Sequence, residues 1–309
     1  MAGGTQSVLI IGGGIMGGDI AIIFAAGNRN VHVMSPSEKT RSSLPARLNA
    51  GLKKLGAAET IAAGVKTHAS LDTIPWAEID LVVEAATEDL ALKKKLFSQL
   101  ETLARPEIPL ASNTSTFPIG EIGGHLKTRS RVVGLHYFMP AHLVPLVEII
   151  QADFTDKAIG DALEKDQKAL GKAPVRVNKD IPGFIGNRLQ HAMMREALYL
   201  VADGVVSPEG IDTAVRYGFG FRFLALGREL LQIHFAVGAE DQAGVEIAQV
   251  DFADAQFERF EVELKGVQVE QFPLEQVVGV ALFNGREVGD VDAAVVVDFC
   301  GTVAAAIEN

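Results

Sequence analysis

The sequence Ser7-Val-Leu-Ile-Ile-Gly-Gly-Gly-Ile-Met-Gly17 joins a short apolar run to a cluster of glycines. An apolar run that ends at glycines is typical of a buried parallel strand, and residues 15–27 are predicted to continue as a helix. This context is the one that the G-x-G-x-x-G motif requires. Its glycines allow a tight turn and let a pyrophosphate approach the backbone at the helix N-terminus. The alternative is a glycine-rich turn without a ligand. As dinucleotide contacts we expect Gly12, Gly14, Ile15, Met16 and Gly17.

Strands and helices alternate after this stretch. Strands are predicted at residues 31–34, 79–84, 110–113, 132–136 and 174–177, and helices at 38–55, 90–103 and 156–171. Such alternation predicts an α/β fold with a Rossmann-type doubly wound parallel sheet. From residue 181 the pattern becomes helical, first at 184–203 and then after the N-cap Ser207. We expect an NAD(P)-binding domain over residues 1–179 and a partial helical domain over residues 180–226.

Residues 227–309 form a tail of a different kind. Residues 226–309 hold 16 acidic and 4 basic side chains, in a chain whose net charge is −11. Alternating residues on either side of Lys265-Gly266 predict a hairpin, and Asn284-Gly285 is typical of a type I′ turn. The tail is either a divergent extension or the product of an altered reading frame, and the sequence leaves both open.

The composition argues against several classes of partner and site. An acidic chain is a poor ligand for nucleic acid, and no apolar run approaches the length of a membrane span. The lone Cys300 excludes an internal disulfide and a thiolate-cluster metal site, so no metal is expected. The N-terminus has no signal-peptide core, and we therefore expect a cytoplasmic protein.

Polar residues lie where predicted strands end, which is where such sheets bind ligands. His136 and Glu148, among apolar residues, have the character of an oriented general base, although His142 competes for that role. The alternative is a core histidine and an outward carboxylate. Ser115 is either a donor to a substrate oxygen or the cap of a helix near Pro118. Asn187 is either a ligand contact or a solvent-facing residue.

Ser35 follows the second predicted strand, where an acidic residue would bind the ribose 2′-hydroxyl. With Ser35 in this position, NADP is not excluded as a cofactor in addition to NAD, because Lys39 or Arg41 could bind a 2′-phosphate. The alternative is that both are solvated cations on a helix. Glu88 and Lys93 follow the third predicted strand. They either touch the nicotinamide ribose or begin a solvated helix.

Four stretches, in order and correctly spaced, resemble the L-3-hydroxyacyl-CoA dehydrogenase family over about residues 5–225. They are residues 112–116, 134–140, 146–150 and 182–188. The resemblance implies that His136 is the catalytic base, with Glu148 as its partner. It also implies that Ser115 bonds the reacting oxygen and that Asn187 orients the substrate or His136.

The same resemblance implies a homodimer that transfers hydride between C3 of a small-molecule 3-hydroxyacyl-CoA and NAD, as in fatty acid metabolism. Glu88, Lys93 and Ser115 match cofactor contacts of the family. Three features depart from its pattern: Met139 replaces an asparagine, Ser35 replaces the ribose-binding acid, and only Lys53 and Lys54 remain of a lysine-rich CoA-binding arm. The departures keep two alternatives open, a dehydrogenase of a small non-CoA acid such as carnitine or gulonate, and an inactive cofactor-binding relative.

Overall fold

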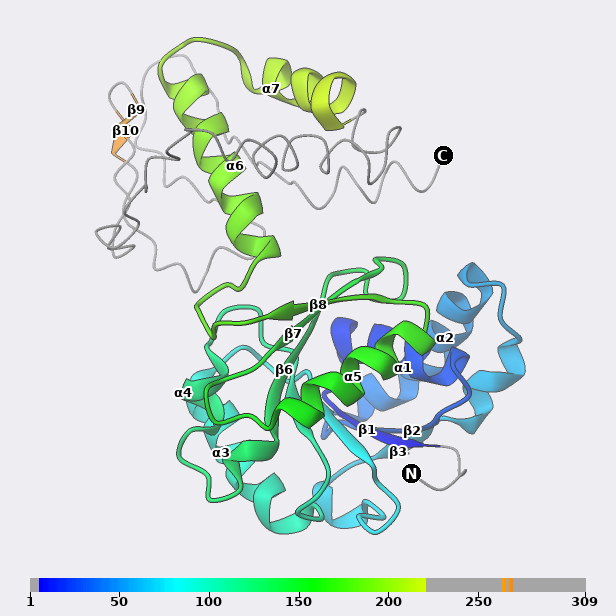
Figure 1. Ribbon diagram of the computed structural model, residues 1–309. Coiled ribbons are helices and arrows are strands. Elements are labelled where there is room, and N and C mark those ends of the chain that lie inside the picture. Colours follow the sequence, from blue (N-terminus) through cyan, green and yellow to red (C-terminus); the bar gives the residue numbers. More distant parts are fainter. Residues whose placement is uncertain (1–5, 221–262, 265–266, 269–309) are drawn as a thin grey trace, which may run out of the picture. The chain divides into compact units, whose positions relative to one another are not determined.

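The computed structural model describes residues 6–220, 263–264 and 267–268 (Figure 1). The chain divides into two compact units, residues 1–189 and residues 190–309. The first unit contains an eight-stranded sheet with the order β3-β2-β1-β4-β5-β6-β7-β8. Its strands are β1 Ser7–Ile11, β2 Asn30–Met34, β3 Lys66–His68, β4 Leu81–Glu84, β5 Leu110–Ser112, β6 Val132–Tyr137, β7 Leu146–Ile150 and β8 Ala173–Val177.

Helices connect most of these strands. In the first unit they are α1 Ile15–Ala26, α2 Glu38–Lys54, α3 Leu90–Leu103, α4 Ile119–Gly123 and α5 Lys157–Ala169. Short 3-10 turns occupy Glu59–Gly64, Leu71–Thr73 and Arg129–Arg131. The later helices are α6 Gly186–Ala202 and α7 Pro208–Ala214, followed by a π-helical stretch at Val215–Phe219. The alternation predicted from the sequence is therefore confirmed, with β3, β7 and the small α4 as additions.

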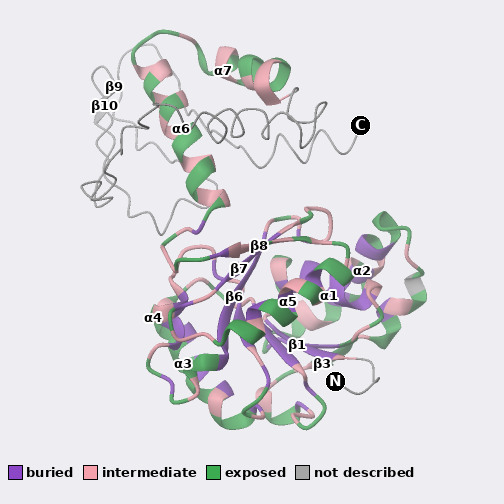
Figure 2. Ribbon diagram, viewed as in Figure 1, coloured by how far each residue is buried: buried purple, intermediate pink, exposed green. Residues whose placement is uncertain are grey.

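The sheet is covered by helices on both faces, as in a doubly wound fold. Successive residues of β1 point to opposite faces. Val8 and Ile10 belong to the core that includes Phe24 of α1 and Leu48 of α2. Leu9 and Ile11 belong to a second core, with Phe97 of α3 and Ile122 of α4. Figure 2 shows the central strands buried between these layers.

The sheet is mostly parallel, but its last two strands run in the opposite direction. The pairs from β3 to β6 are parallel, β7 is antiparallel to β6, and β8 is parallel to β7. Only residues 138–145 connect β6 to β7. A parallel crossover needs a dozen residues or more, so this short connection forces the chain to turn back.

The second unit begins within α6. Ser207 caps α7 as predicted, because its hydroxyl accepts a hydrogen bond from the amide of Gly210 at 3.2 Å. The predicted hairpin around Lys265-Gly266 is also confirmed, since β9 (Glu263–Leu264) pairs antiparallel with β10 (Val267–Gln268). The turn expected at Asn284-Gly285, like the remainder of the tail, lies outside the described residues. No helix in the described part of the chain is both long and apolar enough to span a membrane.

Candidate active site

The glycine-rich loop has no room for side chains at two of its three motif glycines. Gly12 has φ of +103°, and a Cβ there would lie 2.4 Å from the carbonyl oxygen of Ala85. A Cβ on Gly17 would lie 1.7 Å from the carbonyl oxygen of Gly12. A Cβ on Gly14 would meet nothing within 4 Å. The loop thus packs tightly against the sheet and keeps Gly14 open to an approaching ligand.

The first turn of α1 offers its amide groups to an anion. Gly14 is the N-cap, no side chain caps this helix, and its first turn has no acidic residue. Arg47 adds positive charge nearby: Nη1 donates to the carbonyl of Gly14 at 3.0 Å and Nη2 to that of Ile15 at 2.6 Å. A helix N-terminus with these properties fits the pyrophosphate of a dinucleotide.

Ser35 lies at the end of β2, beside this loop. A Cβ on Gly13 would lie 3.2 Å from Cβ of Ser35 and 3.0 Å from Cγ2 of Thr40. The Ser35 amide donates to the carbonyl of His68 at 3.0 Å. Arg41 donates from Nη1 to the carbonyls of Ser35, at 2.6 Å, and Pro36, at 2.9 Å. Ser35 therefore occupies the position of the ribose-binding acid, and the guanidinium of Arg41 is hydrogen-bonded to the Ser35 backbone.

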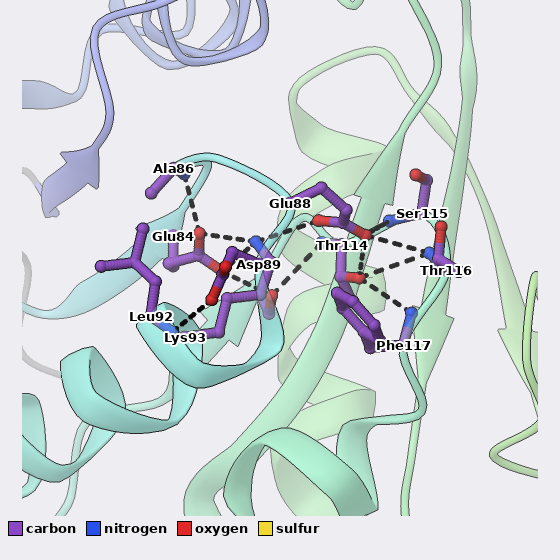
Figure 3. A network of polar contacts seen from close by, with 11 residues as sticks. Glu84, Ala86, Glu88, Asp89, Leu92, Lys93, Thr114, Ser115, Thr116 and Phe117 are labelled. Atoms are coloured by element: carbon purple, nitrogen blue, oxygen red, sulfur yellow. Dashed lines mark hydrogen bonds and ion pairs between the residues drawn. The ribbon is translucent and has the colours of Figure 1, made fainter. Parts of the chain in front are cut away.

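Lys93 is buried in a network of carboxylates (Figure 3). Its Nζ lies 2.8 and 3.0 Å from the two carboxylate oxygens of Glu84 and 3.1 Å from Oε2 of Glu88. Lys93 is 1% exposed and Glu84 is fully buried. Glu84 also accepts hydrogen bonds from the amide of Ala86 and the hydroxyl of Ser112. The ammonium of Lys93 is thus directed at the protein's own carboxylates.

Glu88 connects this network to the loop that carries Ser115. Its Oε1 accepts hydrogen bonds from the Thr114 hydroxyl at 2.5 Å, the Ser115 amide at 3.1 Å and the Thr116 amide at 3.2 Å. These bonds fix the backbone on both sides of Ser115. The sequence suggested Glu88 as a separate cofactor contact and gave no sign of this connection.

Ser115 does not cap α4. The N-cap is Pro118, and the carboxylate of Asp180 accepts from the amides of Ile119 at 2.8 Å and Gly120 at 2.6 Å. Burial raises the pKa of Asp180, and these two hydrogen bonds offset only part of that effect. The capping interpretation of Ser115 is therefore wrong. Asn187 lies beside Ser115, since its Nδ2 donates to the Ser115 carbonyl at 3.3 Å.

His136 and Glu148 face each other across the antiparallel pair β6–β7, where they are register partners. Nδ1 of His136 lies 2.7 Å from Oε2 of Glu148. Both residues are buried, at 4% and 1% exposure. The imidazole is tilted against Phe138 and Phe184, with ring centroids 4.6 and 5.6 Å away. The outward orientation considered for Glu148 is thus wrong, and the dyad is surrounded by aromatic carbon.

The other oxygen of Glu148 is held by the backbone. Its Oε1 accepts from the amides of Ile185 at 3.0 Å and Gly186 at 2.8 Å. Burial alone would raise the pKa of Glu148, but the hydrogen bonds from His136 and the two amides outweigh burial and lower it. The carboxylate is therefore ionised near neutral pH and can only accept hydrogen bonds. Nδ1 of His136 carries the proton, which leaves Nε2 as the basic nitrogen.

His142 contacts a different carboxylate. Its Nδ1 lies 3.4 Å from Oδ2 of Asp19 on α1, and neither ring nitrogen has a hydrogen-bond partner in the structure. Met139, which is 53% exposed, lies in the same β6–β7 connection. Within the described residues no group of three or more His, Cys, Asp or Glu is arranged to hold a metal ion. The geometry therefore favours His136 over His142 as the oriented base.

Two family models together cover most of the chain. Residues 7–181 match the NAD binding domain of 3-hydroxyacyl-CoA dehydrogenase, and residues 183–237 match its C-terminal domain. The chain belongs to the 3-hydroxyacyl-CoA dehydrogenase family. It is an NAD-dependent oxidoreductase of the type that acts on CH–OH donors.

Relatives of the chain differ in their substrates. A 3-hydroxybutyryl-CoA dehydrogenase of Clostridioides difficile is 31% identical over 287 residues, which are 90% of this chain and 100% of the relative. A 5-formyl-3-hydroxy-2-methylpyridine 4-carboxylate 5-dehydrogenase of Mesorhizobium japonicum is 32% identical over 233 residues, 72% of this chain and 73% of the relative. The solved structure of (S)-3-hydroxybutyryl-CoA dehydrogenase from Ralstonia eutropha has a TM-score of 0.64 and 32% identity, covering 70% of this chain and 78% of that one.

Proposed function

We propose that this chain oxidises the C3 hydroxyl of a 3-hydroxyacyl-CoA, with His136 as the general base. The observation that carries the proposal is the 2.7 Å contact between Nδ1 of His136 and the anchored carboxylate of Glu148. A buried imidazole in one tautomer, with its free nitrogen basic, is what proton abstraction from an alcohol requires. The open Gly14 and the uncapped start of α1 support a dinucleotide next to it.

The cofactor would be held along the carboxyl ends of the strands. Backbone amides near Gly12, Gly14, Ile15, Met16 and Gly17 would take the pyrophosphate, and Ser35 would lie at the adenosine ribose. Glu88 and Ser115 would lie toward the nicotinamide half. Since Lys93 is 1% exposed, its part would be to hold Glu88 in place.

Proton and hydride leave the substrate separately. His136 Nε2 would take the proton of the 3-hydroxyl, and Glu148 would stabilise the imidazolium that forms. NAD, when bound, supplies the acceptor for the hydride from C3. In the reverse direction, the imidazolium of His136 would return a proton to the carbonyl oxygen. The Ser115 hydroxyl would donate to the reacting oxygen, and Asn187 would support it through the Ser115 carbonyl.

A second candidate is a small hydroxy compound without CoA, such as carnitine or gulonate. Met139 stands in the β6–β7 connection in place of an amide side chain, and a thioether cannot donate the same hydrogen bonds. Lys53 and Lys54, exposed at the end of α2, are a small remainder of a CoA-binding arm. One relative is also named for a pyridine carboxylate.

The proposed organisation follows the two family models. Residues 1–179 would bind the dinucleotide, and residues 180–226 would contribute to substrate binding and to a homodimer in the cytoplasm. The second model begins at residue 183, which supports a boundary close to there. Residues 227–309 would be a divergent tail. The clostridial alignment, at 90% of the chain, extends into this tail.

The test is oxidation of 3-hydroxybutyryl-CoA, L-carnitine and L-gulonate by the full chain with NAD. We expect activity on the CoA ester, and His136→Gln should lower kcat about 10³-fold while NAD binding is unchanged. His125→Gln, an exposed histidine, is the matched control. Activity on carnitine or gulonate alone would favour the second candidate. Clear NAD binding without turnover of any substrate would indicate an inactive relative, and full turnover by His136→Gln would exclude His136 as the base.

A further inference from the structure

At the adenosine end of the proposed cofactor site, a serine hydroxyl occupies the position at which NAD-binding sheets have a carboxylate. An acid at the end of the second strand bonds the ribose hydroxyls and repels a phosphate on the 2′-oxygen. Here that position is Ser35, which is 5% exposed. Within the described residues no hydrogen bond engages its hydroxyl, and the nearest acid along the chain, Glu38, is exposed on α2. Ser35 itself therefore offers a 2′-phosphate a hydrogen bond and no repulsion.

A guanidinium is fixed at the same place. Both bonds from Arg41 to the Ser35 and Pro36 carbonyls use Nη1, at 2.6 and 2.9 Å. These bonds hold the side chain against the backbone of residues 35–36 and leave Nε and Nη2 as further donors. A guanidinium held in this way has already lost much of the side-chain freedom that binding would otherwise cost.

Arg41 also differs from four other arginines of the first unit in having no acidic partner among the described residues. Four arginines each form an ion pair with an aspartate: Arg29, Arg47, Arg105 and Arg176. Among the residues that the structure describes, no carboxylate pairs with Arg41. Its charge is therefore available to a ligand. Ser35 also packs closely against the glycine-rich loop, because a Cβ on Gly13 would lie 3.2 Å from Cβ of Ser35.

We propose that Ser35 and Arg41 form a subsite for a phosphate monoester on the ribose 2′-oxygen, so that the chain binds NADP as well as NAD. The inference rests on the proposed dinucleotide site and concerns its selectivity alone. The phosphate would accept a hydrogen bond from the Ser35 hydroxyl and charge-assisted bonds from Nε or Nη2 of Arg41. Exposed Lys39 is solvated and does not take part.

The test is calorimetric titration of the full chain with NAD and NADP, and with 5′-AMP and 2′,5′-ADP as minimal probes. We expect NADP to bind at least as tightly as NAD. Arg41→Ala should weaken NADP and 2′,5′-ADP about tenfold or more and leave NAD and 5′-AMP within about twofold. Ser35→Asp, which keeps Arg41, should weaken NADP further and strengthen NAD. Lys39→Ala is the matched control and should change neither cofactor.

The outcomes separate the two proposals. NAD binding with NADP more than about a hundredfold weaker would overturn the subsite and leave the proposed function intact. Equal weakening of both cofactors by Arg41→Ala would also overturn it, because Arg41 would then act only on the backbone. Failure of both dinucleotides to bind would contradict the proposed function and with it this inference. Binding of 2′,5′-ADP no tighter than that of 5′-AMP would also overturn the subsite.

Discussion

The His136–Glu148 pair and the Lys93 network both bury carboxylates that strands of the sheet carry, but the partners of these carboxylates differ. Glu148 faces an imidazole, a group that can exchange a proton with a substrate. Glu84 faces an ammonium and is fully buried with it. The first arrangement places a proton-transfer group beside a carboxylate, and the second places a buried ammonium between carboxylates.

The remaining hydrogen bonds suit these different tasks. Glu148 is held by two backbone amides, so it stays in position whether or not His136 is protonated. Lys93 ties Glu84 and Glu88 together, and Glu88 fixes the backbone on both sides of Ser115. In the proposed mechanism, the first region transfers a proton and the second positions the Ser115 loop. Substitutions that keep shape but alter charge separate the two.

The largest effect is expected for Glu148→Gln. The amides of Ile185 and Gly186 require an oxygen at the Oε1 position, so the new NH2 group must face Nδ1 of His136. Nδ1 then accepts, and the ring proton moves to Nε2, where a base needs a free lone pair. We expect kcat to fall about 10³-fold, roughly 4 kcal/mol of barrier.

The measurement is kcat with the accepted substrate, alongside NAD affinity and Tm, which should change little. Glu121→Gln, an exposed carboxylate on α4, is the control. Wild-type kcat in Glu148→Gln would show that the tautomer of His136 is set elsewhere.

Lys93→Met should have its main effect on folding stability. The substitution leaves the carboxylate of Glu84 buried without its cation, which typically costs about 3 kcal/mol or more. Urea denaturation of the full chain measures the loss, with exposed Lys95→Met as the matched control. The double variant Lys93→Met/Glu84→Gln should recover part of the loss. No recovery would mean that packing, and not the unpaired charge, accounts for it.

Glu88→Gln should have a smaller effect, and on turnover. The amide oxygen can still accept from the residues of the Ser115 loop, but its NH2 group then faces Lys93 Nζ, donor against donor. The resulting shift of the loop should lower kcat about tenfold, roughly 1.4 kcal/mol. Steady-state kinetics measure it, and Asp89→Asn, which disturbs only the cap of α3, is the comparison. An increase in the Kd of NAD with kcat unchanged would instead make Glu88 a cofactor contact.

A third pair, without any carboxylate, gives the smallest effect. His32 Nδ1 lies 3.0 Å from His68 Nε2, and burial lowers the pKa of both rings. Below about pH 6.5 the unfolded chain therefore binds more protons than the folded chain, and stability falls as the pH falls toward the folded-state values. His68→Asn should reduce the drop in Tm between pH 7.5 and 5.5 by about 2 °C. An unchanged or larger drop would contradict the pairing.

Much of the fold was predictable because the strands of the sheet are continuous apolar runs. β3 was not, since Lys66-Thr-His68 is a short polar strand at the sheet edge with no apolar period to reveal it. The reversal at β7 could have been deduced from the short connection at residues 138–145. In the structure, the antiparallel register of β6 and β7 places His136 opposite Glu148.

The site was predictable as a set of residues but not as a set of bonds. Ser115 and His136 were expected at or near strand ends, where parallel strands bring them together. The bond from Glu88 to the Ser115 amide joins two loops that lie after neighbouring strands, β4 and β5. No local pattern specifies such a contact, because it depends on how the two loops pack. The same holds for Asp180, which caps α4 from far along the chain.

Phe184 combines two requirements that conflict. Its backbone is in the left-handed region, at φ +48°, although its side chain is fully buried. For a residue other than glycine this conformation costs on the order of 1 kcal/mol or more. Glycine would relieve the strain but would remove the ring that packs 5.6 Å from the imidazole of His136. Loss of the buried ring would cost about 3 kcal/mol or more, so core packing and the enclosure of His136 both outweigh the relief of backbone strain at residue 184.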